Sequence, residues 1–472
     1  MDKIETPKFE KDSYVLRDEE NQLKIQKDDA WWKFWKKHRI VIAILAFFGF
    51  FTLMVLRVNL SIAIIAMTTS DTDEQPEFQW EPRTRGFILS SFFYGYICCQ
   101  LLGGWLSSKL GGKKVFGYGI GVATLLALLT PPLTRISGIA SPAISSIWAG
   151  WAPPLERTRL TTVAHTGSAI AMLVGLPISG IVADHFGWAS MFYVSSSLGI
   201  FWFVMWMYFV SDRPEDDSRI SPSELAYLKK TLNPNNDKKV VSHPWKEILK
   251  SPAVWAIFIV HFSEAWGHNT MVTQLPSLMR DVLGYKIQKT GIISALPYIA
   301  TTVTMVISSY LADCLVSKKY LTTTQMRKLL TCGASLLQAI FMTAAGYFCA
   351  DPTILMVCIF ISYSAYGFAV SGFLVNYLDI APQHASVLMG LGNTIATISG
   401  IISPNLTGYI VKNKSADEWK IVLMIVGIIY LIGALIYGTF ASGKRQKWAI
   451  VLNEQESRRK FIQTQDTDDN AD

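Results

Sequence analysis

The sequence has few charged residues, and long stretches of it have none. Only 17% of the 472 residues are charged, and they gather in a few loops and at the two ends of the chain. A soluble protein of this size would carry charges on every surface helix. The uncharged stretches are about 20 residues or longer, enough to cross roughly 30 Å of hydrocarbon. The sequence therefore predicts an all-α membrane protein with many spans.

Cysteine clusters, metal-ligand patterns and catalytic motifs are also lacking. The six cysteines lie in or beside apolar runs, which argues against a disulfide framework and against zinc, so we expect small buried side chains. No phosphate-binding loop or catalytic triad is recognisable, so we expect neither an enzyme nor a resident metal or cofactor. A net charge of +7 would suggest nucleic acid in a soluble protein, but in a membrane protein basic residues orient the helices. We expect no nucleic-acid partner.

Eleven apolar runs are long enough to span a membrane. A charged loop, which contains the capping box Ser221-Pro-Ser-Glu224, separates the first five runs from the last six. The runs cover residues 40–70, 86–108, 115–134, 160–183, 186–211, 251–279, 291–312, 329–350, 352–378, 385–411 and 421–442. The chain thus divides into a cytosolic N-terminal tail (1–39), an N-terminal bundle (40–211), a cytosolic central loop (212–250), a C-terminal bundle (251–442) and a cytosolic C-terminal tail (443–472).

Basic residues beside the spans predict their orientation. The segment 31–39 is rich in aromatic and basic residues, which places the N-terminus in the cytosol and the acidic loop 71–81 outside. Two later basic clusters, 109–114 and 157–159, also favour the cytosol, so an even number of spans should separate them. One full-length run lies between them. The other candidate, 136–152, has about 17 uncharged residues, the lower limit for a span, so the fourth span is shortened or missing.

Arg57 lies within the first apolar run, which contains no acidic residue. A charge at the middle of a bilayer costs roughly 2.5 to 17 kcal/mol, depending on the method of measurement. We therefore expect Arg57 to face a protein interior or a watery cavity. A guanidinium binds carboxylate or phosphate through two parallel hydrogen bonds, so the residue predicts an anion site. The alternative is an arginine that pairs with another helix only to hold the structure.

Four stretches of the sequence resemble a known family. They are Arg57-Val-Asn-Leu60, Gly103–Lys114, Trp151-Ala-Pro-Pro-Leu-Glu-Arg157 and Leu378-Asp-Ile-Ala-Pro382. Together they resemble the major facilitator superfamily and, within it, the anion–cation symporter branch that includes sialin and inorganic phosphate cotransporters. The resemblance covers nearly the whole chain, from about Lys36 to Trp448. Its most specific part is the run from Trp151 to Arg157.

The resemblance implies a major facilitator fold, in which two pseudo-repeated helical bundles with about eleven or twelve spans rock around a central anion site. A gapless alignment of residues 104–114 with 309–319 supports the repeat. The family's conformational-switch loops correspond to positions Gly104, Lys109, Lys113, Lys114 and Asp313. In similar proteins the fourth span carries an arginine and one or more glutamates. Those acidic residues are absent here and most of a helix is missing, as in a short splice form or an incomplete gene model.

A polar cluster occupies the seventh span of the family pattern. His261, Glu264 and His268 are spaced to share one helical face, and Asn269 is adjacent to them. A carboxylate beside imidazoles would exchange a coupling proton. The alternative is a polar face that hydrogen-bonds across the bundle.

Uncharged polar residues in other spans are candidate substrate ligands. Asn393 and Thr394, in the eleventh span, are expected to hydrogen-bond to the substrate. His165, in the fifth span, either lines the cavity or packs inside the bundle. Tyr94 and Tyr96 are assigned to packing or to an interface.

These observations predict a secondary active transporter for a sialic acid-like anion, phosphate or an acidic amino acid. Alternating access would be coupled to protons or sodium, and the partners would be the small anion and the lipid bilayer. We expect the protein in the plasma membrane or in a lysosomal or vesicular membrane. Two alternatives stay open: a short form that does not transport, and a passive anion channel or receptor.

Overall fold

The computed structural model of the chain describes residues 38–68, 78, 80–110, 112–128, 157–211, several positions between 215 and 226, and 244–449. Eleven long helices occupy this part of the chain, and all of it is helix, turn or loop, so the predicted all-α fold is confirmed there. The predicted short fourth span, and most of the stretch from Trp151 to Arg157, lie outside the described residues.

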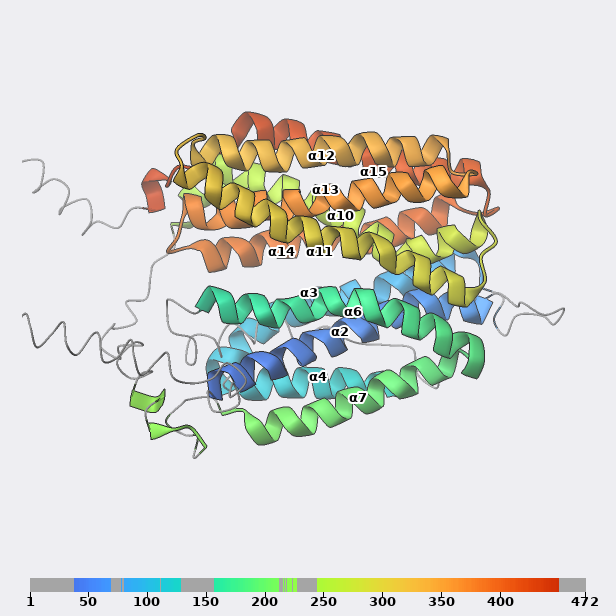
Figure 1. Cartoon of the computed structure of the whole chain (residues 1–472), viewed down its shortest axis with the longest axis horizontal. Coiled ribbons are helices and arrows are strands. Elements are labelled where there is room, and N and C mark those ends of the chain that lie inside the picture. Colours follow the sequence, from blue (N-terminus) through green and yellow to red (C-terminus); the bar gives the residue numbers. More distant parts are fainter. Residues whose placement is uncertain are drawn as a thin grey trace, which may run out of the picture.

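The helices form two layers, one from each half of the chain (Figure 1). The first layer contains α2 (His38–Thr68), α3 (Pro82–Leu110), α4 (Gly112–Leu128), α6 (Arg157–Phe186) and α7 (Trp188–Phe209). The second contains the short α9 (Trp245–Lys250), then α10 (Pro252–Asp281), α11 (Ile287–Ser317), α12 (Thr323–Tyr347), α13 (Pro352–Ile380), α14 (Ala385–Ile410) and α15 (Ala416–Phe440), with a 3₁₀ turn at Lys447–Ala449. We call these layers the N-terminal and C-terminal bundles. The exact domain boundaries that we expect from the sequence stay predictions.

Polar capping residues fix several helix starts, and hydropathy alone misplaces two of these, the starts of α12 and α15. Thr322 and Gln325 form a reciprocal capping box at the start of α12, six residues before the apolar run that predicts this helix. Ser415 and Glu418 form the same motif at the start of α15. The Asp351 carboxylate accepts two backbone N–H groups at the start of α13. Such side chains satisfy the free N–H groups of the first helical turn.

Part of the central loop caps α2. In the predicted capping box, the backbone N–H of Glu224 donates to Ser221 Oγ at 3.2 Å. The Glu224 carboxylate accepts from the backbone N–H groups of His38 and Arg39, at 2.8 and 3.3 Å. A carboxylate at a helix N-terminus is stabilised by the free N–H groups and by the helix dipole. The loop is thereby fixed to the N-terminal bundle.

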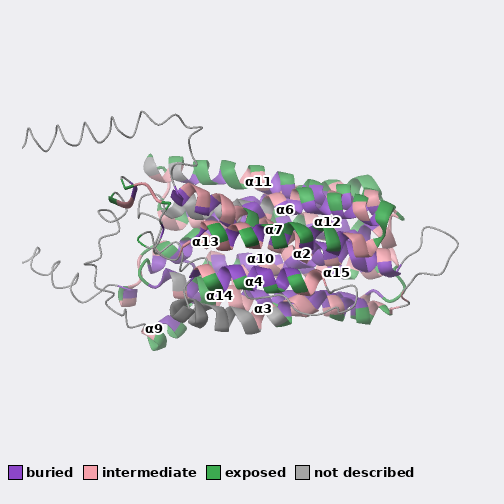
Figure 2. Ribbon diagram, turned by 90° about the horizontal axis from the view of Figure 1, so that it is seen from below, coloured by how far each residue is buried: buried purple, intermediate pink, exposed green. Residues whose placement is uncertain are grey.

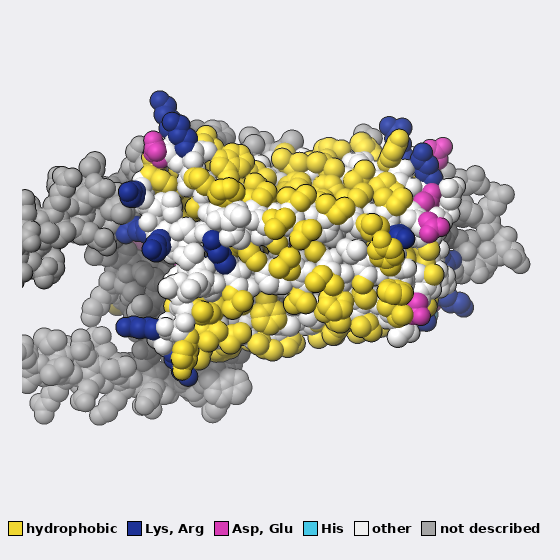
Figure 3. Space-filling model, turned by 90° about the horizontal axis from the view of Figure 1, so that it is seen from above, with side chains coloured by type: hydrophobic (Ala, Val, Ile, Leu, Met, Phe, Trp, Pro, Cys, Tyr) yellow, Lys and Arg dark blue, Asp and Glu magenta, His cyan; other side chains and the backbone are white. Residues whose placement is uncertain are grey.

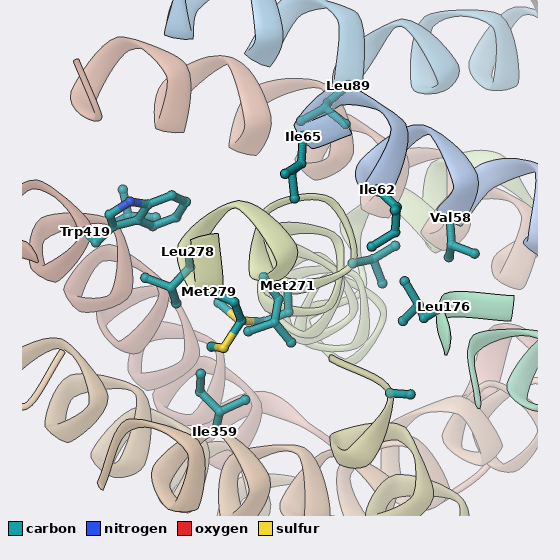
Figure 4. Packing of buried hydrophobic residues seen from close by; sticks show 14 of the residues in the cluster. Val58, Ile62, Ile65, Leu89, Leu176, Met271, Leu278, Met279, Ile359 and Trp419 are labelled. Atoms are coloured by element: carbon teal, nitrogen blue, oxygen red, sulfur yellow. The ribbon is translucent and has the colours of Figure 1, made fainter. Parts of the chain in front are cut away.

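The largest apolar core in the described residues belongs to both bundles. Figure 4 shows Val58, Ile62 and Leu89 of the N-terminal bundle facing Met271 and Leu278 of α10. The members of this core that belong to α2 and α10 lie in the second half of each helix. We call this the shared core, and orientation by basic residues predicts that it lies at the external end.

Two further cores belong to one bundle each. The first is built from α2, α4 and α7 around Phe116 and Trp206. The second is built from α9, α10, α13, α14 and α15 around Phe258 and Tyr377. The first core involves the beginning of α2 and the second the beginning of α10, and both helices begin at the predicted cytosolic end. Among the described side chains, apolar packing joins the two bundles at one end, whereas each bundle has a core of its own at the other.

The outer surface suits a lipid environment. A broad band of hydrophobic side chains covers the middle of the molecule, and lysine and arginine gather toward its ends (Figure 3). Exposed positions lie along the outer faces of the helices, whereas buried positions face inward (Figure 2). Seven of the described helices are long and apolar enough to cross a membrane. The other four predicted spans correspond to the helices α3, α4, α6 and α10.

The cysteine prediction is partly wrong. Among the cysteines whose side chains are described, Cys349 and Cys358 are buried and free, as expected. Cys314, however, is exposed near the end of α11, where its neighbours Tyr310 and Leu311 are also exposed. An apolar run predicts a helix that enters a membrane, but it does not tell which face of that helix meets lipid rather than protein.

Candidate functional site

Arg57 lies near the middle of α2, on the face that meets the C-terminal bundle. Its Nη2 donates to Asn269 Oδ1 of α10 at 2.8 Å. The guanidinium carbon lies 5.0 and 4.9 Å from the ring centroids of Phe92 and Phe93 on α3, within cation–π range. Its Nε is buried and has no hydrogen-bond partner, and no described carboxylate forms an ion pair with the guanidinium. This positive charge has aromatic and amide neighbours and spare donor capacity.

Four tyrosines on three helices lie near the guanidinium. Tyr96 of α3, Tyr298 of α11, and Tyr363 and Tyr366 of α13 all lie within electrostatic range of Arg57. The rings of Tyr298 and Tyr363 meet edge to face, with centroids 5.2 Å apart. Sequence reasoning assigned Tyr96 to packing or to an interface and missed the other three. A tyrosine has no distinct hydropathy signal inside a span, so its place in a site is apparent only after the helices have packed.

Amide side chains connect the two bundles around this point. Asn269 Nδ2 donates to Ser399 Oγ of α14 at 3.1 Å. The predicted substrate ligand Asn393 donates to the Tyr96 hydroxyl at 3.2 Å, from α14 across to α3. The Thr394 hydroxyl instead donates to the Gly390 carbonyl of its own helix at 2.9 Å. Asn393 is therefore at the bundle interface, whereas the Thr394 hydroxyl is already bonded within α14.

The three ionisable residues of α10 have different partners. Glu264 is fully buried and accepts from Ser335 Oγ at 2.5 Å and from Gln338 Nε2 at 3.0 Å, both on α12. His261 Nδ1 is hydrogen-bonded to the Tyr377 hydroxyl at 3.1 Å. The His268 ring stacks on Tyr366, with centroids 5.3 Å apart.

Helix geometry explains this divergence. Residues seven apart lie almost in line, whereas a residue three positions on is rotated by about 60° from that line. His261 and His268 therefore both meet α13, and Glu264 is turned toward α12. No described contact joins the carboxylate to either imidazole. The polar face predicted from the spacing is real, but its members bond to different helices.

The remaining predicted residues lie at or beyond the limits of the described side chains. His165, Gly104, Lys109 and Asp313 lie in α6, α3 and α11, with side chains outside the described set. Lys113 and Lys114 lie in the first turn of α4. The Lys113 carbonyl accepts from Trp206 Nε1 at 3.1 Å, and the Lys114 side chain is exposed.

An ion pair that sequence reasoning did not identify joins α12 to α13. Arg327 Nε donates to Asp379 Oδ2 at 2.7 Å, and Arg327 Nη1 donates to the Ser371 carbonyl at 3.3 Å. Asp379 belongs to the Leu378–Pro382 stretch that carries the family resemblance. An acidic residue at the end of an apolar run was the signal that could have identified it. The pair lies within the C-terminal bundle, at the predicted cytosolic end.

Comparison with known proteins finds a matching family model and relatives that are similar over most of the chain. The family model of the Major Facilitator Superfamily matches residues 40–404. Human sialin is 37% identical over 450 residues, which cover 87% of this chain and 91% of sialin. Human vesicular glutamate transporter 2 is 34% identical over 459 residues, which cover 91% of this chain and 78% of that protein.

Solved structures show the same fold. A bacterial homologue of the human lysosomal transporter Spinster, inward-facing and occupied, superposes with a TM-score of 0.66 at 10% identity, covering 85% of this chain and 96% of that one. The D-xylose–proton symporter superposes with a TM-score of 0.65 at 15% identity, covering 86% and 99%. The chain is thus a multi-pass integral membrane protein that belongs to the major facilitator superfamily, in the anion–cation symporter branch with sialin and the vesicular glutamate transporters.

Proposed function

We propose that the protein moves a small anion across a membrane by coupled alternating access, with Arg57 as the group that binds the anion. One observation carries this proposal: a guanidinium between the two bundles has a buried Nε without an acceptor and no described carboxylate partner. Keeping such a charge inside a membrane protein is costly, so its retention favours a functional role. The relatives point the same way, since vesicular glutamate transporters are named for an anionic amino acid.

The surroundings of Arg57 suit an organic acid or phosphate that carries one dominant charge. A guanidinium pairs with carboxylate or phosphate through two parallel N–H bonds. Tyrosine hydroxyls and the amides of Asn269 and Asn393 offer further neutral hydrogen bonds. Sialic acid-like sugars, acidic amino acids and phosphate all meet these requirements.

We assign the coupling role to Glu264. Its carboxylate is fully buried, it accepts hydrogen bonds only from neutral groups, and no described basic side chain pairs with it. A buried carboxylate without a cation is expensive to keep charged, so a proton is the counter-ion that fits this position. His261 and His268 lie on the same helix and meet tyrosines of α13, which offers polar neighbours but no direct contact with Glu264.

The first experiment uses purified protein in proteoliposomes and labelled sialic acid, glutamate and phosphate, with and without an imposed proton or sodium gradient. We expect uptake of one anion to follow one gradient, and Arg57→Ala to lower that uptake about a hundredfold, because two charge-assisted hydrogen bonds are lost. Arg57→Lys keeps the charge but loses the planar fork, so its activity should be intermediate. Arg83→Ala, at an exposed arginine on α3, is the matched control.

Other results would contradict this proposal. Uptake by Arg57→Ala at the wild-type rate would remove Arg57 from the anion site. Anion flux that equilibrates but never accumulates against a gradient would indicate a passive channel. No uptake or binding of any of the three anions by a well-folded preparation would favour the short form that does not transport.

A further inference from the structure

A small cavity lies between the two bundles at the predicted external end. Its volume is about 20 Å³, which is enough for one water molecule. Its wall includes Arg85, in the first turn of α3 in the N-terminal bundle, and Asp281, the last residue of α10 in the C-terminal bundle. The bundles are in close contact here, because a Cβ atom on Gly86 of α3 would overlap the Pro404 carbonyl oxygen of α14. Two opposite charges therefore line one cavity from the two sides of the interface.

Arg85 is buried in this interface without a bonded partner. The residue is only 8% exposed, and its Nε is buried and has no hydrogen-bond partner. Among the described residues, no side chain forms an ion pair with its guanidinium. A buried donor that has lost water and gained no acceptor costs free energy. The externally closed arrangement therefore bears a cost at Arg85 that disappears when water reaches the side chain.

Asp281 has the opposite charge but does not offset this cost by direct contact. It is partly buried and lies within electrostatic range of Arg85, Lys414 and Arg280, yet no described ion pair joins it to Arg85. Trp419 Nε1 lies close to its carboxylate but has no partner at hydrogen-bond geometry. Attraction between buried charges compensates for their lost hydration only when their contact geometry is good. A pair that is dehydrated and held apart is therefore unfavourable in the closed arrangement.

We propose that Arg85 and Asp281 destabilise the externally closed arrangement and thereby keep the external end of the carrier able to reopen. This inference rests on the proposed alternating access. Burial of the shared core favours closure, whereas the two charges favour the open arrangement, in which water hydrates both. A carrier has to visit both arrangements, so neither should be much more stable than the other.

This role is opposite in sign to that of a gating salt bridge. A salt bridge would stabilise closure, so removing both charges would make opening easier. If the two charges instead oppose closure, removing both makes opening harder. Removing only one charge makes opening easier in either case, because the remaining charge stays buried with less compensation. The double variant therefore decides between the two roles.

The experiment measures opening directly. Leu89→Cys provides the reporter, since Leu89 is buried, lines the same cavity and lies one turn of α3 beyond Arg85. In a background without other cysteines, we would measure its rate of reaction with a membrane-impermeant maleimide in intact proteoliposomes, after size-exclusion and thermal-melt checks of folding. We expect Arg85→Met combined with Asp281→Leu to slow the reaction roughly tenfold and to lower anion uptake. Each single substitution should accelerate the reaction severalfold.

A matched control tests whether the effect requires a buried charge. Arg83 lies two residues before Arg85 on α3 but is exposed. We expect Arg83→Met to change the reaction rate by less than about twofold, because a hydrated charge pays little on closure. If the double variant fails to fold, Arg85→Gln combined with Asp281→Asn replaces it, and the reaction should again become slower.

The outcomes distinguish this inference from the function on which it rests, because the labelling needs no substrate. Faster labelling in the double variant would identify a gating salt bridge and overturn the proposal, and an unchanged rate would overturn it as well. Either result could be obtained with transport through Arg57 intact. Slower labelling in the double variant of a protein that takes up no anion would instead support the role of the two charges and overturn the proposed function.

Discussion

The two ends of the molecule are built differently. At the predicted external end, α2, α3 and α6 share one apolar core with α10 and its neighbours. At the predicted cytosolic end, each bundle has its own core. Buried apolar area is the main favourable term in packing, so the bundles adhere where the core is shared. The difference implies that movement would open the shared core while each separate core travels with its own bundle.

Glycines allow this close approach at the shared end. A Cβ atom at Gly291 of α11 would lie 2.6 Å from the Leu176 carbonyl oxygen of α6 and 3.1 Å from Gly180 Cα. Where α14 packs against α3, a Cβ on Gly408 of α14 would lie 2.5 Å from the Pro82 carbonyl oxygen of α3. Backbone atoms cannot move aside as flexible side chains do, so these positions require residues without a Cβ.

Among the tests of this difference between the two ends, the largest effect should follow from enlarging one of these glycines. Gly291→Val places a branched side chain against the α6 backbone, so α6 and α11 must separate and the shared end cannot close. We expect uptake to fall by more than about tenfold, because a carrier held open at one side cannot complete its cycle. Opening is measured by adding Leu89→Cys, at a buried position of the shared core, in a background without other cysteines. The introduced thiol should then react with an external thiol reagent.

Gly333→Val is the matched control, since a Cβ there meets no atom within 4 Å. It should transport like the unmodified protein and leave the introduced thiol unreactive. Normal transport by Gly291→Val, with that thiol still protected, would show that the shared core is not a moving contact.

A second, smaller effect tests a group that lies within one bundle. Glu264 bonds only to Ser335 and Gln338 of α12 among the described residues, so Glu264→Gln should leave closure of the shared end unchanged. An amide cannot exchange a proton, and we expect gradient-driven accumulation to disappear while exchange of internal for external anion continues. Measuring both modes in the same proteoliposomes makes the distinction. Accumulation at the wild-type level would leave Glu264 with only its hydrogen-bonding role.

Ser335→Ala is the companion control, because it removes one bond to the carboxylate but keeps the carboxylate itself. We expect it to retain gradient-driven accumulation. Loss of accumulation in both variants would implicate the local hydrogen-bond arrangement rather than the proton.

The sequence was sufficient to predict the helices and the unusual arginine. Long apolar runs identify spans, and the cost of an intramembrane charge singles out Arg57. Hydropathy failed at helix starts such as Thr323, because the capping residues are polar and lie before the apolar run. The pairing of Arg57 with Asn269 and the four tyrosines near the guanidinium were missed, since neutral polar residues acquire a role only when distant helices meet.

The spacing of the α10 residues also shows that a sequence pattern does not predict contacts between helices. The pattern from His261 to His268 gives the polar face of one helix, but the rotation of Glu264 toward α12 depends on where α12 and α13 pack. Periodicity is a property of one helix, whereas a binding site is a property of several. Contacts between helices, rather than single residues, therefore decide how this site behaves.

The smallest expected effect is on stability at the predicted cytosolic end, where each bundle has its own core. Arg327→Ala leaves Asp379 without its ion-pair partner inside the C-terminal bundle, where the two side chains are 14% and 18% exposed. We expect the free energy of unfolding to fall by about 1–3 kcal/mol, as for loss of a partly buried charged hydrogen bond, seen as a lower melting temperature. Anion affinity should not change, because the pair joins α12 to α13 within one bundle and has no described contact with Arg57.

A double-mutant cycle completes this last test. If the pair acts as one unit, Arg327→Ala combined with Asp379→Ala should cost less than the sum of the two single changes, because the second substitution removes a charge that the first left unpaired. Strict additivity would mean that the two side chains stabilise the bundle independently. A change in anion affinity would mean that the separate core of the C-terminal bundle is coupled to the site, and the division between shared and separate ends would then be less sharp than the packing indicates.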